Sequence, residues 1–289
     1  NNPTKPQVWR IFLDREFSAK LRIIKKDADT GKTVLIPNTE FKIYNLDKKE
    51  YVSMTTTYPS KVTHTSFFTD EDGDLILPDV LNVGNYRIEE IAAPYGYVLN
   101  ENYVEVAVDS DTFYEVDQDT YEAIITIDYE DQPEFGELTI IKKGEVLDSY
   151  EGGFFADSDE KTFIYREGTL AGAKFEVYAA EDIYTADMQL DENGNRTKYY
   201  SKDELVATLV TGKDGKATLK DLPLGNYKIV EVEAPFGYVL NKDEQVVTFR
   251  YVDDKTPVVY ETSTFADERQ KFNLFVNKLD AETKKPVPG

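Results

Sequence analysis

The stretch Ile88-Glu89-Glu90-Ile91-Ala92-Ala93-Pro94-Tyr95-Gly96-Tyr97-Val98-Leu99-Asn100 recurs with few changes as Val230-Glu231-Val232-Glu233-Ala234-Pro235-Phe236-Gly237-Tyr238-Val239-Leu240-Asn241. Around these copies an Asp stands eleven positions before a Lys three times, at Asp14 and Lys25, Asp131 and Lys142, and Asp267 and Lys278. A junction repeated in this way is typical of tandem domains, with the Asp closing one unit and the Lys opening the next. Each complete unit therefore has one Lys, one Glu and one Asp at equivalent places.

The repeat predicts two complete domains, residues 18–133 and residues 134–270. Measured from Lys25 to Lys142 and from Lys142 to Lys278, the repeats are 117 and 136 residues long, and each is long enough for its own core. We predict that residues 1–17 are the end of a preceding domain or a linker, and that residues 271–289 are the opening strand of a truncated following domain.

Composition excludes several classes of function. With 55 acidic and 33 basic residues the net charge is -22, which repels nucleic acid and anionic membranes. The chain has no cysteine, so thiol catalysis, thiolate metal sites and disulfides are excluded. The single histidine, His64, is expected to be a strand or loop residue, because acid-base and zinc sites need further partners. No apolar run approaches the roughly 18 to 20 residues that span a bilayer, so we expect no membrane contact within this segment.

Short runs of alternating apolar residues dominate the chain, as at Leu21 and Ile23 or at Ile125, Ile127 and Tyr129. Alternation with this enrichment in Tyr, Phe, Val, Ile and Thr is typical of half-buried antiparallel strands. We therefore predict an all-β chain of tandem β-sandwich domains, with a short helical turn near Lys202 to Val206.

The acidic cluster Asp70-Glu71-Asp72-Gly73-Asp74 resembles the start of a calcium loop. An EF-hand loop starting at Asp70 would need its closing Glu where Leu81 stands, so that motif fails. The second unit has Thr211-Gly212-Lys213-Asp214-Gly215-Lys216 at this place, which favours a hairpin turn. The sequence predicts no metal site and no cofactor.

The second unit contains two insertions. One includes Tyr150-Glu151-Gly152-Gly153-Phe154-Phe155, and the other runs from Asp182 to Tyr200. Such segments either cover a sheet edge or bind a ligand, and the sequence leaves both uses open.

The repeated Lys, Glu and Asp carry the chemistry. If the first and last strands of a unit are adjacent and these residues point inward, an amine and two carboxyl groups share an apolar site. Burial disfavours charge, so a neutral amine beside a protonated acid becomes accessible. The amine could then attack the Asp carboxyl carbon while the Glu moves protons, leaving an amide and water. The alternative is a buried ion pair in each unit, with the repeat reflecting duplication alone.

Further motifs identify a relationship. The segments Lys25-Lys26-Asp27-Ala28-Asp29-Thr30-Gly31-Lys32, Phe41-Lys42-Ile43-Tyr44 and Gly84 to Tyr97 resemble the collagen-adhesin B-type, or SpaA-like pilin, domain of Gram-positive surface proteins. The second unit is similar at Lys142, at residues 170–178 and from Gly225 onward. The resemblance covers nearly all of residues 18–270.

This resemblance implies a transthyretin-like (prealbumin-like) Greek-key sandwich. It also implies an intramolecular isopeptide bond between a Lys of the first strand and an Asn or Asp of the last, assisted by the Glu before Ala-Pro. By position, the crosslinked residues would be Lys25 with Asp131 and Lys142 with Asp267, with Glu90 and Glu231 as the catalytic proton shuttles. Two departures matter. The acceptor is Asp, whereas Asn is commoner in this family, and Asp128 on the same segment is a rival to Asp131. The second unit has Lys142-Lys143-Gly144 in place of Lys-x-Asp.

The function that follows is a structural stalk or backbone segment of an adhesin or pilin, outside the cell and anchored to the wall of a Gram-positive bacterium. Its expected partners are neighbouring domains of the same surface protein. The alternative is a module that binds host extracellular matrix protein or glycan through the insertions of the second domain. In neither case is the chain an enzyme, because self-crosslinking is a single turnover. The anchor and signal peptide are expected outside this segment.

Overall fold

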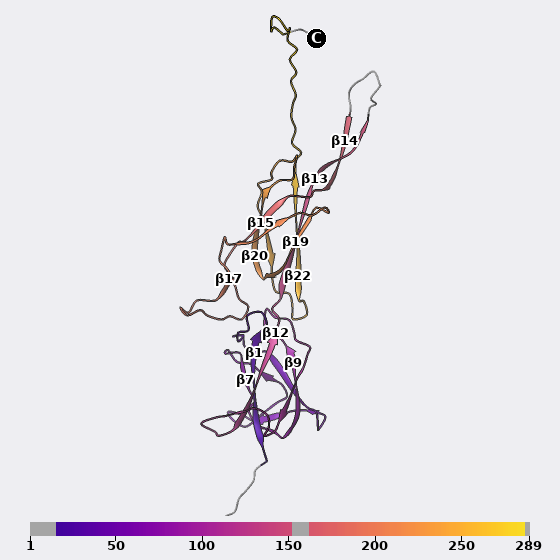
Figure 1. The fold of residues 1–289 in the computed structure, drawn as a ribbon. Helices are drawn as coiled ribbons and strands as arrows, with labels where there is room; N and C mark the ends of the chain where they lie inside the picture. Colours follow the sequence, from indigo (N-terminus) through magenta and orange to yellow (C-terminus); the bar gives the residue numbers. More distant parts are fainter. Residues whose placement is uncertain (1–15, 152–161, 287–289) are drawn as a thin grey trace, which may run out of the picture. The chain divides into compact units, whose positions relative to one another are not determined.

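The computed structural model describes residues 16–151 and 162–286, and all regular structure in these ranges is β-strand (Figure 1). Asp14, Phe154 and Phe155 lie outside the described residues. The chain divides into two compact units. Unit 1 comprises residues 1–136, 182–200 and 249–259, and unit 2 comprises residues 137–181, 201–248 and 260–289.

Unit 1 contains two sheets that face each other across an apolar core. The first sheet has the order β11 (Glu115–Val116), β12 (Ala123–Asp131), β1 (Ser18–Asp27) and β7 (Asp74–Ile76), with β8 (Leu81–Asn82) also pairing β1. The second has the order β10 (Val104–Val108), β9 (Gly84–Ala92), β2 (Glu40–Asn45) and β3 (Glu50–Tyr51), with β6 (Phe67–Phe68) also pairing β2. The inward residues include Leu21, Ile23, Phe41, Ile43 and Ile88, all completely buried.

Strands β1 and β12 run parallel, although they are the first and last long strands of the sandwich. Burial alternates strictly along β1, because successive side chains of a strand point to opposite faces. Lys25 falls on the same inward face as Leu21 and Ile23. The alternation predicted from the sequence is therefore observed, and it places a charged side chain in the core.

Unit 1 also includes two hairpins, β4 (Met54–Thr56) with β5 (Val62–His64) and β16 (Ile183–Tyr184) with β17 (Lys198–Tyr200). The second hairpin belongs to the insertion predicted at Asp182 to Tyr200. Its buried Asp187 accepts a hydrogen bond from the hydroxyl of Thr30 at 2.8 Å, and Gln189 donates to the Thr33 carbonyl at 2.7 Å. This insertion therefore packs on the segment that follows β1.

Unit 2 repeats the two-sheet arrangement. One sheet has the order β14 (Thr162–Thr169), β13 (Phe135–Glu151) and β19 (Lys216–Pro223), with β22 (Val258–Asp267) also pairing β13. The other has the order β18 (Leu205–Val210), β15 (Lys174–Ala179), β20 (Gly225–Glu233) and β21 (Gln245–Phe249). Strands β13 and β14 continue as an antiparallel ladder as far as the pair Glu151 and Thr162.

Two local expectations need correction. Residues 202–203 form a turn and Leu205–Val210 is a strand, because it pairs with β15, so there is no helical turn near Lys202 to Val206. The acidic cluster at residues 70–74 does form a tight turn, closed by the Asp70 N–H on the Asp74 carbonyl at 2.8 Å. The strands that flank it, β6 and β7, lie in different sheets, so the turn is not a hairpin. Across the described ranges no helix is long and apolar enough to cross a bilayer.

Candidate functional site

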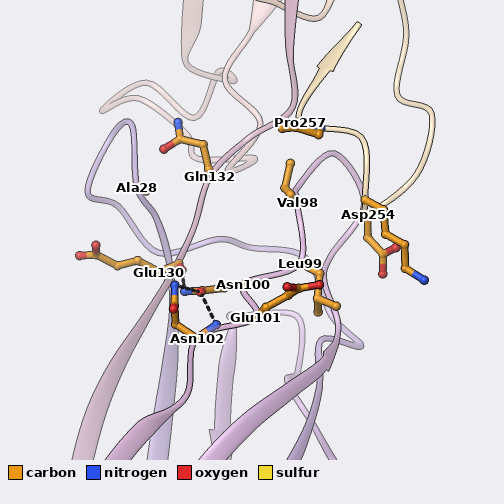
Figure 2. Close-up of a pocket in the computed structure, with 11 residues that line it drawn as sticks. Ala28, Val98, Leu99, Asn100, Glu101, Asn102, Glu130, Gln132, Asp254 and Pro257 are labelled. Atoms are coloured by element: carbon orange, nitrogen blue, oxygen red, sulfur yellow. Dashed lines mark hydrogen bonds between the residues drawn. The ribbon is translucent and has the colours of Figure 1, made fainter.

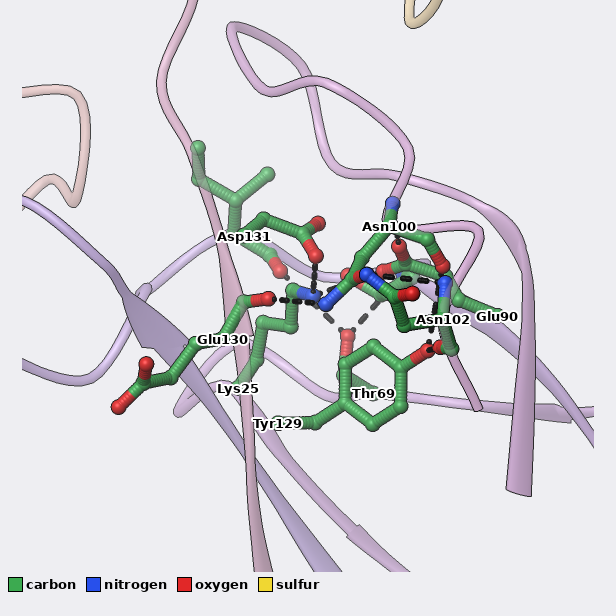
Figure 3. A network of polar contacts seen from close by, with 10 residues as sticks. Lys25, Thr69, Glu90, Asn100, Asn102, Tyr129, Glu130 and Asp131 are labelled. Atoms are coloured by element: carbon green, nitrogen blue, oxygen red, sulfur yellow. Dashed lines mark hydrogen bonds and ion pairs between the residues drawn. The ribbon is translucent and has the colours of Figure 1, made fainter. Parts of the chain in front are cut away.

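The inward faces of unit 1 bring together Lys25, Glu90 and Asp131 (Figure 3). Lys25 lies on β1, Asp131 ends the neighbouring strand β12, and Glu90 reaches across from β9 in the opposite sheet. The Lys25 Nζ donates to Glu90 Oε1 at 2.8 Å and forms an ion pair with Asp131 Oδ1. The three side chains are completely buried, so the amine and both carboxyl groups share one dry site.

Aromatic rings close the sides of this site. The Lys25 Nζ lies 4.7 Å from the centre of the Tyr129 ring and 5.8 Å from that of Phe41. These two rings pack edge to face at 5.1 Å. Charged groups in such a low-dielectric site are poorly solvated. Burial raises the pKa of Asp131 to about 8, with the Lys25 ammonium opposing the rise and Glu90 adding to it. Burial therefore favours the protonated form of Asp131.

The two candidate acceptors of the first unit occupy opposite faces of β12. Asp128 is exposed, whereas Asp131 is 1% exposed and contacts Lys25. Alternation along the strand explains the difference, since residues 128 and 131 have opposite parity. The geometry thus brings Asp131, and not Asp128, to the lysine.

Unit 2 contains the equivalent cluster. The Lys142 Nζ donates to Glu231 Oε2 at 2.7 Å and forms an ion pair with Asp267 Oδ1, and all three side chains are completely buried. Phe175 lies beside the amine, 5.8 Å from Nζ to the ring centre. Burial raises the pKa of Glu231, with Lys142 opposing the shift and Asp267 adding to it. The adjacent Lys143 pairs instead with the exposed Glu167 at 2.8 Å. The absence of the Lys-x-Asp pattern therefore does not displace Lys142 from the site.

Sequence reasoning missed one residue of each cluster. The backbone N–H of Asn100 donates to Glu90 Oε2 at 3.0 Å, and the backbone N–H of Asn241 donates to Glu231 Oε2 at 3.3 Å. The signal was present, because both asparagines end the repeated stretch that also contains the glutamates.

The remaining sequence-predicted residues lie apart from the clusters. Lys278 is exposed, and Asp14 is outside the described residues. His64 lies on β5, where its Nε2 shares a hydrogen bond of 2.9 Å with the Thr56 hydroxyl. Within residues 16–151 and 162–286, no group of three or more His, Cys, Asp or Glu could hold a metal ion.

An amine held against two buried carboxyl groups can do one of two things. It can remain a buried ion pair, or it can condense with one carboxyl group to form an amide. The second outcome needs a neutral amine, a protonated acceptor and a third group that moves protons, and each cluster contains one amine and two carboxyl groups.

Comparison with known proteins gives one family match. The model of the SpaA prealbumin-like fold domain matches residues 19–122 and 160–264, which together are more than half of the chain. No curated protein is significantly similar to the chain.

The chain also matches solved structures, among them the following three. The Bacillus anthracis TIE protein is 21% identical with a TM-score of 0.47, and the match covers 88% of this chain and 34% of that one. The minor pilin GBS52 of Streptococcus agalactiae is 19% identical with a TM-score of 0.30, and the match covers 90% of this chain and 100% of that one. The shaft pilin SpaA of Lactobacillus rhamnosus GG is 15% identical with a TM-score of 0.29, and the match covers 89% of this chain and 100% of that one. The chain therefore spans about a third of the length of the TIE protein.

Proposed function

The chain belongs to the family of SpaA prealbumin-like fold domains, and from this premise we propose that it is a structural stalk segment of a Gram-positive surface adhesin or pilin, stabilised by a Lys-Asp isopeptide bond in each domain. The bonds join Lys25 to Asp131 and Lys142 to Asp267. In this proposal the two repeats, residues 18–133 and 134–270, are successive domains, and residues 182–200 and 249–259 of the second repeat group with the first domain.

One observation carries the proposal: a completely buried lysine contacts a buried Asp and a buried Glu, and the whole set occurs twice. A bare buried ion pair stabilises poorly, because the cost of desolvating the charges offsets their attraction. Two such clusters at equivalent places are better explained by a reaction than by stability alone.

The condensation balances without a cofactor. The neutral Lys25 Nζ attacks the carboxyl carbon of protonated Asp131, and Glu90 accepts a proton from the attacking nitrogen. Glu90 then returns that proton to the departing hydroxyl group, so that one C–N bond forms, one C–O bond breaks and one water leaves. Fixed proximity supplies most of the acceleration, because the reacting groups are already in contact.

Crosslinks of this kind suit a stalk outside the cell. The chain has no cysteine, so its domains have no disulfide that could hold them together. A bond between the first and last strands puts tension on covalent atoms instead of on the hydrogen bonds between strands. In this role the partners are neighbouring domains of the same protein, and the chain is anchored to the cell wall through parts outside this segment.

Intact mass spectrometry tests the proposal. Each condensation removes one water, so the purified chain is expected to weigh roughly 36 Da less than its sequence, about 18 Da for each bond. A Lys25→Met/Lys142→Met double variant is the control and should weigh the same as its own sequence. A wild-type mass equal to the sequence mass would exclude the isopeptide bonds.

A second candidate function has one observation in its favour. Tyr150 and Phe163 are cross-strand partners on the β13–β14 ladder and are 60% and 51% exposed. Exposed aromatic pairs are typical of surfaces that bind proteins or glycans. Solid-phase binding to matrix proteins and glycans, compared between wild type and a Tyr150→Ser/Phe163→Ser variant, tests this alternative. Binding that the double substitution abolishes would make the second domain a ligand-binding module.

A further inference from the structure

We propose that Asn100 and Asn241 are positioning residues that hold the shuttle glutamate and the acceptor Asp of each domain together for condensation. This inference rests on the proposed function and extends it to a residue outside the Lys, Glu and Asp set.

In unit 1 Asn100 makes three contacts through its backbone N–H, its side-chain Nδ2 and its Oδ1 (Figure 3). Its backbone N–H donates to Glu90 Oε2 at 3.0 Å, which leaves Oε1 for Lys25. Its side-chain Nδ2 donates to the Glu130 carbonyl at 2.8 Å. Its Oδ1 accepts the Asn102 N–H at 3.0 Å, which fixes the turn of its own loop. One residue therefore connects the shuttle, the acceptor strand and the loop between them.

The acceptor is held from both sides. Glu130 immediately precedes Asp131, and its carbonyl is bound by Asn100. Gln132 immediately follows Asp131, and its carbonyl accepts the Val98 N–H at 3.0 Å. The loop that carries Asn100 therefore fixes the main chain on either side of the reacting carboxyl group.

Unit 2 repeats these contacts, although the residues around its asparagine differ from those in unit 1. The Asn241 N–H donates to Glu231 at 3.3 Å, its Nδ2 donates to the Ala266 carbonyl at 3.2 Å, and its Oδ1 accepts the Asp243 N–H at 2.9 Å. The Val239 N–H donates to the Glu268 carbonyl at 2.9 Å, so Asp267 is also held from both sides. Here Lys142 and Asn241 share Glu231 Oε2.

The shared contacts identify the asparagine as the common element. In unit 1 the Tyr129 hydroxyl also binds the loop, on the Asn100 and Asn102 carbonyls at 3.2 and 2.5 Å. The equivalent residue in unit 2 is Phe265, which has no hydroxyl group. Unit 2 thus makes the contacts between the loop, the glutamate and the acceptor strand without this tyrosine hydroxyl. The asparagine, in contrast, is present in both units.

The surroundings explain why the loop must be held. A cavity of about 650 Å³ lies beside the first cluster and is lined by residues of unit 1, among them Leu99, Asn100, Asn102 and Glu130 (Figure 2). Reaction requires a protonated Asp131, and that protonation depends on burial. The Asn100 contacts keep the loop closed between this cavity and the buried carboxyl groups.

Timed peptide mapping of the full chain tests the inference, using Asn100→Asp and Asn241→Asp. Aspartate keeps the Oδ acceptor of the turn but has no Nδ2–H for the carbonyl. After cell-free synthesis and quenching at intervals, the bond in the altered domain should form several-fold more slowly, up to about tenfold, as loss of one side-chain hydrogen bond to the acceptor strand predicts. The bond in the other domain should form at the wild-type rate within the same molecules. Asn193→Asp, the same substitution at an exposed asparagine in the turn between β16 and β17, is the matched control and should leave both rates unchanged.

A pH profile separates positioning from mere stabilisation. In unit 2 the charged groups that face Glu231 are Lys142 on β13 and Asp267 on β22. Asn241→Ala keeps the backbone N–H that donates to Glu231 but removes the Nδ2 contact that holds this N–H in place. As the loop loosens, the charged form of Glu231 loses this donor and its pKa rises further, so the pH profile of the second bond should move to higher pH. A residue that only stabilises the fold would lower the folded fraction, measured by circular dichroism in a Lys142→Met background, without moving this profile.

The outcomes separate the two proposals. A wild-type chain that lacks roughly 36 Da, together with Asn100→Asp and Asn241→Asp chains that crosslink at wild-type rates, overturns the positioning role and leaves the proposed function standing. A wild-type chain at its full sequence mass removes both, since there is then no reaction to position.

Discussion

Lys25 and Asp131 lie on neighbouring parallel strands, two residues apart in register: Lys25 is opposite Tyr129, and Asp131 is opposite Asp27. Tyr129 and Asp131 share a strand face because side chains alternate, so the lysine that lies against the Tyr129 ring also reaches the next inward residue. Strand register alone thus places these two side chains in contact.

Glu90 is expected to be needed for the first bond alone. In Glu90→Ala the domain should fold, but Lys25 and Asp131 should stay unlinked because no group moves the protons. Intact mass should then fall by about 18 Da instead of roughly 36 Da. Glu231→Ala should give the converse result, with only the first bond formed. If either variant retained both bonds, another carboxyl group would be the shuttle.

Loss of the first bond should destabilise its domain substantially. On the chain-entropy model, a crosslink that closes a loop of roughly 100 residues contributes on the order of 4 to 5 kcal/mol to the free energy of unfolding. Lys25→Met should lose this contribution, as measured by hydrogen exchange of peptides from β1 and β12 in the full chain. Lys26→Met, on the opposite face of β1, is the matched control and should exchange like wild type. Equal protection in Lys25→Met and Lys26→Met would contradict the crosslink.

The uncrosslinked first domain should become less stable as the pH rises. The folded-state pKa of Asp131 is about 8 with Lys25 present, and Lys25→Met removes the ammonium that opposes the rise. The carboxyl group therefore takes up a proton on folding, and its contribution is complete below the unfolded pKa of about 3.9. That contribution is lost as pH rises toward the folded pKa, by up to about 1.4 kcal/mol per pH unit.

The matched comparison for this pH dependence is Lys25→Met/Asp131→Asn, in which the titrating group is gone. At each pH, the amide hydrogen-exchange rates of Lys25→Met are divided by those of this double variant. The ratio should rise from pH 5 to pH 8, because Lys25→Met loses protection as Asp131 ionises. A ratio that stays constant with pH would mean that Asp131 is ionised in the folded domain.

Lys278 should keep a free amine. Its side chain is exposed, whereas those of Lys25 and Lys142 are completely buried against carboxyl groups. A peptide map should recover residues around Lys278 unmodified and open to acetylation by a reagent that leaves Lys25 and Lys142 untouched. Recovery of Lys278 in a crosslinked peptide would show that domains of different molecules exchange strands.

Stretching single molecules should distinguish the stalk from the binding module. Tension enters the first domain near Lys25 and leaves near Asp131, so a bond between them carries the load past the intervening residues. Wild type should show no unfolding step for this domain, whereas Lys25→Met should show a step of roughly 100 residues at about 3.3 to 3.6 Å each, less the folded length. Unfolding steps of that size in wild type would remove the mechanical role.

Much of the candidate site could be predicted because its members repeat and lie in phase with apolar residues. The alternation Ile125, Ile127, Tyr129 continues to Asp131, so the choice against Asp128 was already contained in the strand pattern. Asn100 also repeats, as Asn241, but it lies in a loop, outside any strand alternation that would show which way its side chain points. Its side chain contacts only the main chain, at the Glu130 carbonyl and the Asn102 N–H, and it reaches the Glu90 carboxyl group through its own backbone N–H. Contacts to the main chain can be made to any residue type, so they leave no matching side chain to find in the sequence.

The strands could largely be predicted from the sequence, but which segments belong to which unit could be predicted less well. The insertion at residues 182–200 joins unit 1 through polar contacts such as Thr30 with Asp187, which leave no periodic pattern in the sequence. Likewise, Leu205–Val210 is a strand because it pairs with β15, and this long-range pairing overrides the local preference for a helical turn.

The contact between Lys25 and Asp131 also has a topological consequence. Once these residues are joined, the chain between them becomes a closed ring with two linear tails. A protease that cuts the exposed loop at Tyr58, which is 89% exposed, would open that ring without releasing a fragment. The nicked molecule would gain only the mass of one water, about 18 Da, and would still migrate as a single species under denaturing conditions. Proteolytic damage at the surface of this domain would therefore leave every residue of the chain attached to both of its ends.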